Sequence, residues 1–211
     1  MKPLIKPGDR LLFQGDSITD CGRRDSVDGL GNGYVPVIKG WLEARPASAG
    51  HRLLNRGIGG DRTTELLARW QLDCLDLQPD LLSIMIGVND VWRIRGPWEG
   101  QTWVPPELFL SNYRSLIESA LASGIKQLAL MSPTTIENET DAELSGLLDQ
   151  RAATVQALAG EYRACYVPTR EVYVAALKNA PDTQWTLDGC HPTVSGYALI
   201  AATWLEAIGL V

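Results

Sequence analysis

The chain has 211 residues, of which 45% are hydrophobic and 21% are charged, and this suits one globular domain better than two. Its net charge is −6 and it contains no run of lysine or arginine, so we expect neither nucleic acid nor an anionic membrane as a partner. The N-terminal residues hold no apolar stretch, and no apolar run approaches the ~20 residues of a transmembrane helix. These features predict a cytoplasmic protein without a signal peptide.

The cysteines and histidines give little support for a metal or a disulfide framework. Four cysteines occur and none forms a Cys-x-x-Cys pair, so we expect free thiols that are buried or half-buried in a reducing compartment. They are Cys21, Cys74, Cys165 and Cys190. With only two histidines as well, a catalytic zinc site is not expected, and we predict no metal and no other cofactor.

Apolar runs typical of strands alternate with helical patterns along the whole chain. Strands are predicted at 10–14, 51–55, 81–86, 126–131 and 164–167. Helices are predicted at 34–44, 63–75, 105–123, 141–162, 169–178 and 192–208. This alternation implies a single α/β domain over residues 1–211, with a parallel sheet between helices. The long loop at 87–104 is expected to be functional.

Ser17 is the first candidate for chemistry, because it follows the first predicted strand by a few residues, in a polar turn. Open α/β sheets bind ligands outside the carboxyl ends of their strands. A serine alone is a weak nucleophile, so catalysis also requires a base, an acid that orients the base, and donors for an oxyanion.

His191 is the better candidate base. His51 opens a predicted strand at the end away from Ser17, where a surface histidine is expected. His191 lies on a loop before the last predicted helix, and Asp188 stands three residues earlier. Such a carboxylate can bind one ring nitrogen and leave the other for the serine proton; the alternative is that Asp188 is a simple turn residue. Cys190 adjoins His191, and this geometry is poor for a cysteine–histidine pair.

Two further strand ends offer donors for an oxyanion. The segment 55–61 contains Gly57, Gly59 and Gly60, whose backbone N–H groups can approach a ligand closely. The segment 87–90 contains Asn89, whose side-chain amide can also donate. The alternative is that these glycines and this asparagine only form turns.

The segments 15–18, 55–60, 87–90 and 188–191 resemble the sequence blocks of the SGNH hydrolases, also called the GDSL esterase/lipase family, with isoleucine at position 18 in place of the usual leucine. The resemblance implies a flavodoxin-like three-layer α/β/α sandwich with a five-stranded parallel sheet. The order of the blocks along the chain agrees with that of the family.

The same resemblance implies a role for each candidate residue. Ser17 would be the nucleophile, His191 the base and Asp188 its partner. The oxyanion hole would be formed by the backbone N–H groups of Ser17 and Gly60 and by the Asn89 side chain. Gly60 is preferred because the glycine of the family falls five residues after the asparagine of its block.

Within that family, the segments 15–23, 31–35, 83–93 and 191–196 resemble the intracellular acetylxylan esterase branch. Members of that branch remove acetyl groups from xylo-oligosaccharides, and some form oligomers. We therefore expect a serine esterase that cleaves short-chain acyl esters of small molecules, foremost O-acetyl groups on carbohydrate, through an acyl-enzyme. A homo-oligomer is a further expectation.

Tryptophans near the predicted site suit the apolar faces of sugar rings. Trp92 and Trp185 are assigned to substrate binding together with Asp16, whereas Trp98 and Trp103 could instead lie at a subunit interface. Two other functions stay open: a thioesterase or lysophospholipase of the same family, and a non-catalytic glycan-binding protein on the same fold.

Overall fold

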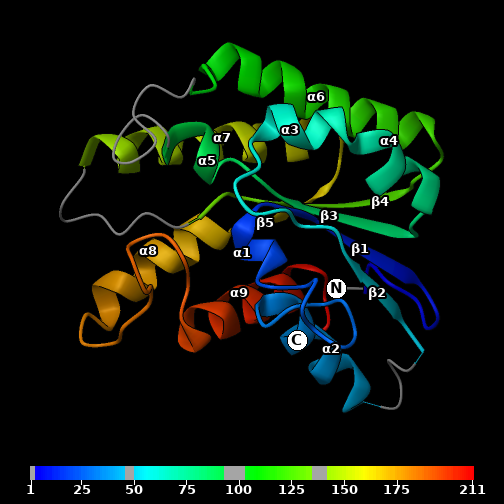
Figure 1. The fold of residues 1–211 in the computed structure, drawn as a ribbon, viewed down its shortest axis with the longest axis horizontal. Coiled ribbons are helices and arrows are strands. Elements are labelled where there is room, and N and C mark those ends of the chain that lie inside the picture. Colours follow the sequence, from blue (N-terminus) through cyan, green and yellow to red (C-terminus); the bar gives the residue numbers. More distant parts are fainter. Residues whose placement is uncertain (1–2, 46–49, 93–102, 135–141) are drawn as a thin grey trace.

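The computed structural model describes residues 3–45, 50–92, 103–134 and 142–211. One sheet of five parallel strands has the order β2-β1-β3-β4-β5 (Figure 1). The strands are β1 (Arg10–Gly15), β2 (Arg52–Asn55), β3 (Leu81–Met85), β4 (Gln127–Met131) and β5 (Cys165–Val167). This is the flavodoxin-like order, in which the direction of winding changes between β1 and β3. The predicted sheet and fold are confirmed.

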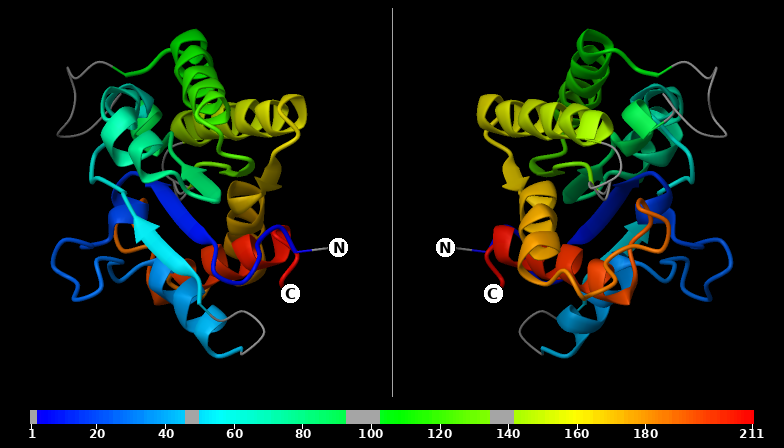
Figure 2. Two further views of the ribbon diagram at one scale, coloured as in Figure 1. Left: turned by 90° about the vertical axis from the view of Figure 1, so that its right-hand side faces the viewer. Right: turned by 90° about the vertical axis from the view of Figure 1, so that its left-hand side faces the viewer.

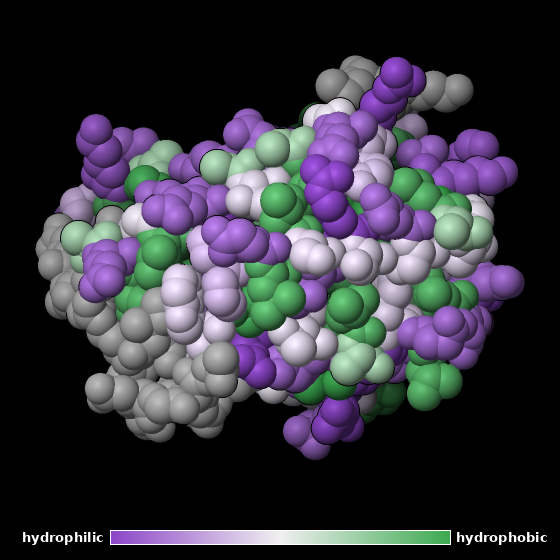
Figure 3. All heavy atoms as spheres, turned by 90° about the horizontal axis from the view of Figure 1, so that it is seen from above, coloured by the Kyte–Doolittle hydropathy of each residue, from purple (hydrophilic) through white to green (hydrophobic). Residues whose placement is uncertain are grey.

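Helices cover both faces of the sheet, which produces the three layers of the sandwich (Figures 1 and 2). One face carries α2 (Tyr34–Glu43), α8 (Thr169–Asn179) and α9 (Val194–Ala207). The other carries α3 (Thr63–Ala68), α4 (Trp70–Asp73), α6 (Pro106–Ala122) and α7 (Ala142–Glu161). Seen from the side of α6, the surface mixes apolar and polar side chains (Figure 3). Among the described residues, no helix is long and apolar enough to cross a bilayer.

The central strands β1, β3 and β4 are buried on both faces, which explains their largely apolar sequences, whereas the edge strands β2 and β5 are partly exposed. In β1, Leu11 and Phe13 pack in the core under α2 and α9, whereas Leu12 packs in the core under α6. Phe13 contacts the Trp204 ring of α9 at a centroid distance of 5.2 Å. The last helix is therefore anchored directly on the first strand.

The predicted helix at 63–75 is interrupted at Arg69. This residue has φ −103° and ψ 5°, and it separates α3 from α4, which is followed by the 3-10 helix η2 (Leu75–Leu77). The guanidinium of Arg69 bonds to several groups outside the helix, and these tertiary contacts override the helical pattern.

Two short helices form where the sequence predicts loop. They are α1 (Ser17–Asp20), directly after β1, and α5 (Val88–Trp92), inside the predicted loop at 87–104. Residues 93–102 of that loop lie outside the described ranges. The last helix begins at Val194 because Thr193 caps it, while Pro192 pairs with Thr186 in an antiparallel bridge.

A buried carboxyl group caps α1. Asp16 is 2% exposed, and its Oδ1 accepts the backbone N–H of Ile18 at 3.0 Å. Burial raises the pKa of Asp16 to about 8; the carboxyls of Asp90 and Asp61 add to the rise, and the Ile18 hydrogen bond opposes it. The folded protein therefore favours the protonated form of this group.

We expect Gly15→Ala to destabilise the fold by about 2 kcal/mol or more, because a Cβ at Gly15 would overlap the Thr19 hydroxyl and the Met85 carbonyl. Gly40→Ala is the matched control, since Gly40 lies in α2 with open space around it and alanine favours helix by about 0.5–1 kcal/mol. Urea unfolding measures both changes. Equal stabilities for the two variants would contradict the close approach at Gly15.

Asp16→Asn tests the buried carboxyl, because asparagine keeps an acceptor for the Ile18 N–H but cannot ionise. An unfolded aspartate loses its proton near pH 3.9, whereas folded Asp16 keeps it to about pH 8, so this group lowers stability as pH rises between those values. We expect the variant to gain on the wild type by a few kcal/mol between pH 5 and pH 9, at about 1.4 kcal/mol per pKa unit. Urea unfolding of both proteins at each pH measures this. The same difference in free energy of unfolding between variant and wild type at pH 5 and at pH 9 would refute the prediction.

Candidate active site

Three loops meet at the carboxyl edge of the sheet. Ser17 follows β1, the turn 57–60 follows β2, and Asn89 follows β3. Because β1 lies between β2 and β3 in parallel pairing, the ends of the three strands are neighbours. The fold thus brings the predicted nucleophile and both predicted donor segments to one place.

The structure joins Ser17, His191 and Asp188 by hydrogen bonds. Ser17 Oγ lies 2.9 Å from His191 Nε2, and His191 Nδ1 lies 2.8 Å from Asp188 Oδ2. The second carboxylate oxygen of Asp188 accepts the backbone N–H groups of His191 at 2.7 Å and Cys190 at 3.0 Å. Asp188 therefore orients both the ring and the loop that carries it. With Nδ1 donating to Asp188, Nε2 is an acceptor for the serine proton.

The pKa of Asp188 is lowered. Partial burial of its carboxyl raises the pKa, but the hydrogen bonds from the backbone and ring of His191 and from the Cys190 N–H outweigh that effect. The carboxylate is therefore ionised at neutral pH and can hold the ring N–H. Its side chain is 53% exposed, so water screens part of its charge.

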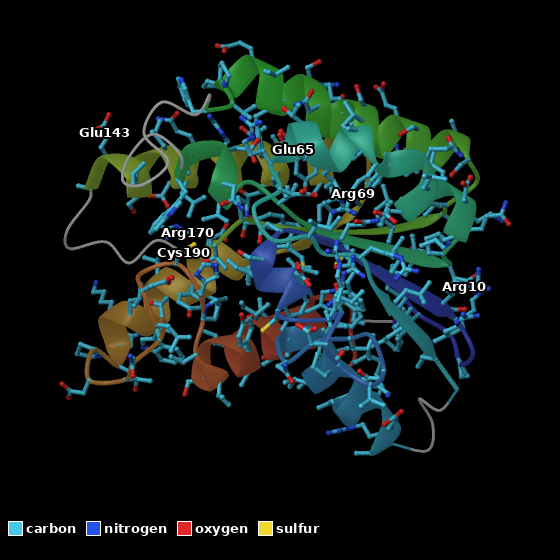
Figure 4. The ribbon with its side chains drawn as sticks, viewed as in Figure 1. Arg10, Glu65, Arg69, Glu143, Arg170 and Cys190 are labelled. Carbon is cyan, nitrogen blue, oxygen red and sulfur yellow. The ribbon has the colours of Figure 1, made fainter. Side chains whose placement is uncertain are left out.

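The other histidine lies apart from this hydrogen-bonded chain, whereas Cys190 donates its backbone N–H to Asp188. His51 directly precedes β2, at the opposite edge of the sheet from Ser17. Cys190 is buried in the core, and burial raises the pKa of its thiol, which therefore stays protonated (Figure 4). As predicted, all four cysteines are free thiols, half-buried or buried. Within the described ranges, no three His, Cys, Asp or Glu side chains are grouped as metal ligands.

The predicted oxyanion donors lie at the start of α1, in the turn after β2 and in α5. Ser17 is the first residue of α1, where a backbone N–H has no acceptor within the helix. Gly60 has φ +84°, a conformation that favours glycine, in a turn closed by a hydrogen bond from Asp61 N–H to Ile58 O. The Asn89 side chain donates one N–H to the Asp61 carbonyl at 3.1 Å. An amide has two such hydrogens, so the second can serve an oxyanion.

The turn 57–60 packs directly against α1. A Cβ on Gly57 would overlap the Asp20 backbone, and a Cβ on Gly59 would lie 3.8 Å from the Ser17 Cβ. The Gly59 N–H donates to Asp20 Oδ2 at 3.0 Å. Asp20 thereby fixes the turn beside Ser17, a role that the sequence alone did not indicate.

Asp90 is a further buried acid that the sequence-based reasoning left without a role. Its carboxylate accepts the backbone N–H of Thr63 and the Thr63 hydroxyl at 2.6 Å, which ties the loop after β3 to the start of α3. Burial raises the pKa of Asp90 to about 6, against the opposing effect of the Thr63 hydrogen bonds. Its place directly after Asn89, close behind a predicted strand, is the sequence signal for it.

The three residues assigned to substrate binding differ in their surroundings. Trp92 ends α5 and is half-buried against the core. Trp185 donates its indole N–H to Ala180 O at 3.0 Å and packs edge-on against Tyr173. Asp16 is buried and caps α1, which favours a role in orienting Ser17. Their contacts with substrate stay predictions.

Comparison with known proteins identifies relatives over the whole chain. Residues 13–199 match the sequence model of the GDSL-like lipase/acylhydrolase family. An acetylxylan esterase from Geobacillus stearothermophilus is 34% identical over 213 residues, which cover 97% of this chain and 96% of that protein.

Solved structures agree with this relationship. Axe2, an acetylxylan esterase from Geobacillus stearothermophilus, superposes with a TM-score of 0.88 and 35% identity over 97% of this chain and 96% of that one. LAE5, an alpha/beta hydrolase enzyme from the metagenome of Lake Arreo, gives a TM-score of 0.90 at 29% identity, with 98% of each chain covered. Three other Axe2 structures are described as catalytic mutants, with a serine, an aspartate or a histidine replaced by alanine.

The family match and the near-complete alignment with an acetylxylan esterase both show which family the chain belongs to. The chain belongs to the GDSL-like lipase/acylhydrolase family and is a carboxylic ester hydrolase.

Proposed function

We propose that the protein is a serine esterase that removes short acyl groups, foremost O-acetyl groups on carbohydrate, through an acyl-enzyme. The observation that carries the proposal is the continuous hydrogen-bonded chain from Asp188 through His191 to Ser17. The acetylxylan esterase from Geobacillus stearothermophilus, 34% identical over almost the whole chain, supports the choice of substrate class. A cytoplasmic location and a homo-oligomeric state are part of the same proposal.

In the first half of the reaction, Ser17 Oγ attacks the ester carbonyl while His191 Nε2 takes the serine proton. Asp188 stabilises the imidazolium that forms. The carbonyl oxygen becomes an oxyanion and accepts hydrogen bonds from the Ser17 and Gly60 N–H groups and from Asn89 Nδ2. His191 then gives its proton to the alcohol oxygen as the carbon–oxygen bond breaks, and the acyl group stays on Ser17.

In the second half, His191 takes a proton from water, and the resulting hydroxide attacks the acyl-enzyme carbonyl. The same donors stabilise the second oxyanion, and each well-placed donor contributes a factor of about 10²–10³ to kcat. Return of the proton from His191 to Ser17 Oγ releases the carboxylic acid and restores the enzyme.

The exposure of the base and its partner supports a bulky alcohol group. The side chains of His191 and Asp188 are 42% and 53% exposed, so the proton that leaves His191 is delivered at the protein surface. An alcohol as large as a sugar can approach such a site from solvent. A long acyl chain would instead need a deep apolar groove for the acid part of the ester.

We expect wild-type protein to release acetate from acetylated xylo-oligosaccharides and to favour two-carbon over eight-carbon nitrophenyl esters. Ser17→Ala should abolish both activities, because no second nucleophile takes part. Acetate release and nitrophenol absorbance are the measurements. Preference for acyl chains of eight carbons or more would favour a lipase or thioesterase role, and activity that persists in Ser17→Ala would refute the proposed nucleophile.

Asp188→Asn should lower kcat by about 10²–10³-fold, because an amide can hold the His191 ring in the wrong tautomer. The loss should be smaller than the ~10⁴-fold known for a fully buried aspartate, since water reaches half of the Asp188 side chain. Asp182→Asn is the matched control, as Asp182 is an exposed residue of the same connection before α9. Steady-state kinetics decide: equal kcat for the two variants would remove Asp188 from the mechanism.

A further inference from the structure

Arg69 lies between α3 and α4, and its guanidinium reaches the end of β1 close to the candidate active site. It stands at the interruption between α3 and α4, and its side chain is 14% exposed, between these helices and the strands (Figure 4). Nε donates to Asp61 Oδ2 at 2.7 Å, and Nη2 donates to the Gly15 carbonyl at 3.3 Å. Nη1 donates to Gln14 Oε1 at 2.9 Å and to Asp73 Oδ2 at 3.1 Å.

Two of these partners lead directly to the predicted oxyanion donors. Asp61 follows Gly60 in the chain, and the Asp61 carbonyl accepts the Asn89 side-chain N–H at 3.1 Å. Asp61 is therefore bonded to one donor and covalently joined to another. Its own carboxylate is held by Arg69.

The third donor is reached through the end of β1. Gly15 precedes Ser17 by two residues, and its carbonyl accepts both the Arg69 guanidinium and the Ile58 N–H, the latter at 3.1 Å. The guanidinium thus binds the end of β1 at the same carbonyl that the turn after β2 binds. The Arg69 side chain therefore binds both residues, Asp61 and Gly15, that connect to Ser17, Gly60 and Asn89.

We propose that Arg69 is a positioning residue of the oxyanion hole, which sets the distance between the Ser17, Gly60 and Asn89 donors by binding Asp61 and Gly15 at once. The inference rests on the proposed function, since it concerns the donors assigned there. Arg69 itself does not touch the reacting atoms.

The geometry requires an arginine. Its planar fork supplies three nitrogens in fixed directions to acceptors on β1, on the turn after β2 and on α4. A lysine is a single point charge and can keep the Asp61 contact or the Gly15 contact, not both in this arrangement. A displacement of about 1 Å at a reacting group costs about 10²-fold in rate. A small shift of the Ser17, Gly60 or Asn89 donor therefore lowers the rate measurably.

Arg69→Met should lower kcat on nitrophenyl acetate by about 10–100-fold with KM changed less than about threefold, because the donors act mainly in the transition state. The kcat of Arg69→Lys should lie between those of Arg69→Met and the wild type. Arg10→Met is the matched control: Arg10 begins β1, at the end away from Ser17, and its guanidinium donates to the Leu77 carbonyl (Figure 4). Its kcat should stay within about twofold of wild type.

A thionoester gives the readout that a structural role would not change. Its thiocarbonyl sulfur is a poor hydrogen-bond acceptor, so a well-formed oxyanion hole favours the oxygen ester over the thionoester. Loss of folded protein lowers both rates equally. Displaced donors instead lower the ratio of the oxygen-ester rate to the thionoester rate. We expect that ratio to fall about 10-fold in Arg69→Met and to stay at the wild-type value in Arg10→Met.

An unchanged ratio in Arg69→Met would overturn the inference, and if that variant does not fold, an unchanged ratio in Arg69→Lys would do so. Ser17→Ala separates this result from the proposed function. If Ser17→Ala is inactive while the Arg69 variants keep the wild-type ratio, only the positioning role fails. If Ser17→Ala still cleaves the ester, the proposed nucleophile fails as well.

Discussion

The candidate site depends on one buried amide. Asn55 is 1% exposed, and its Nδ2 donates to the carbonyls of Thr19 and Leu30, at 2.6 and 2.8 Å, while its Oδ1 accepts the Gly57 N–H at 2.9 Å. A buried amide left without partners costs about 1–3 kcal/mol, so these bonds define one arrangement of the loops. That arrangement places α1 and the turn after β2 in contact. This contact holds the turn after β2 beside α1, as the proposed oxyanion hole requires.

Burial and ion pairing modify the charge of the carboxyl groups around the candidate site. Asp16, Asp61 and Asp90 are buried near the strand ends, and burial raises the pKa of each. With a pKa of about 8, Asp16 is mostly protonated at neutral pH although it directly precedes Ser17. Asp61 carries its charge against Arg69. Asp188 is ionised and lies on the far side of His191 from Ser17, where it would stabilise the imidazolium of the proposed mechanism.

The sequence predicted those parts of the structure that depend on local pattern. Buried parallel strands are continuous apolar runs, and glycines and polar residues at their ends mark the turns, so the sheet, the family and the grouping of Ser17 with His191 and Asp188 followed from it. The interruption at Arg69 did not, because the residues around it have a helical pattern and the bonds that break the helix come from β1 and from Asp61. Asp90 and Asn55 were missed as scaffold residues for the same reason: their partners are distant in sequence.

The distance along the chain between Ser17 and His191 has a consequence for biosynthesis. Ser17 Oγ and His191 Nε2 are 174 residues apart, and the loop of His191 is placed by α9, whose Trp204 packs on Phe13 of the first strand. A ribosome that has not yet made residue 191 has therefore produced Ser17 without the proposed base. Under the proposed mechanism, hydrolysis requires α9 to dock on β1, so esterase turnover would report that this step of folding is complete.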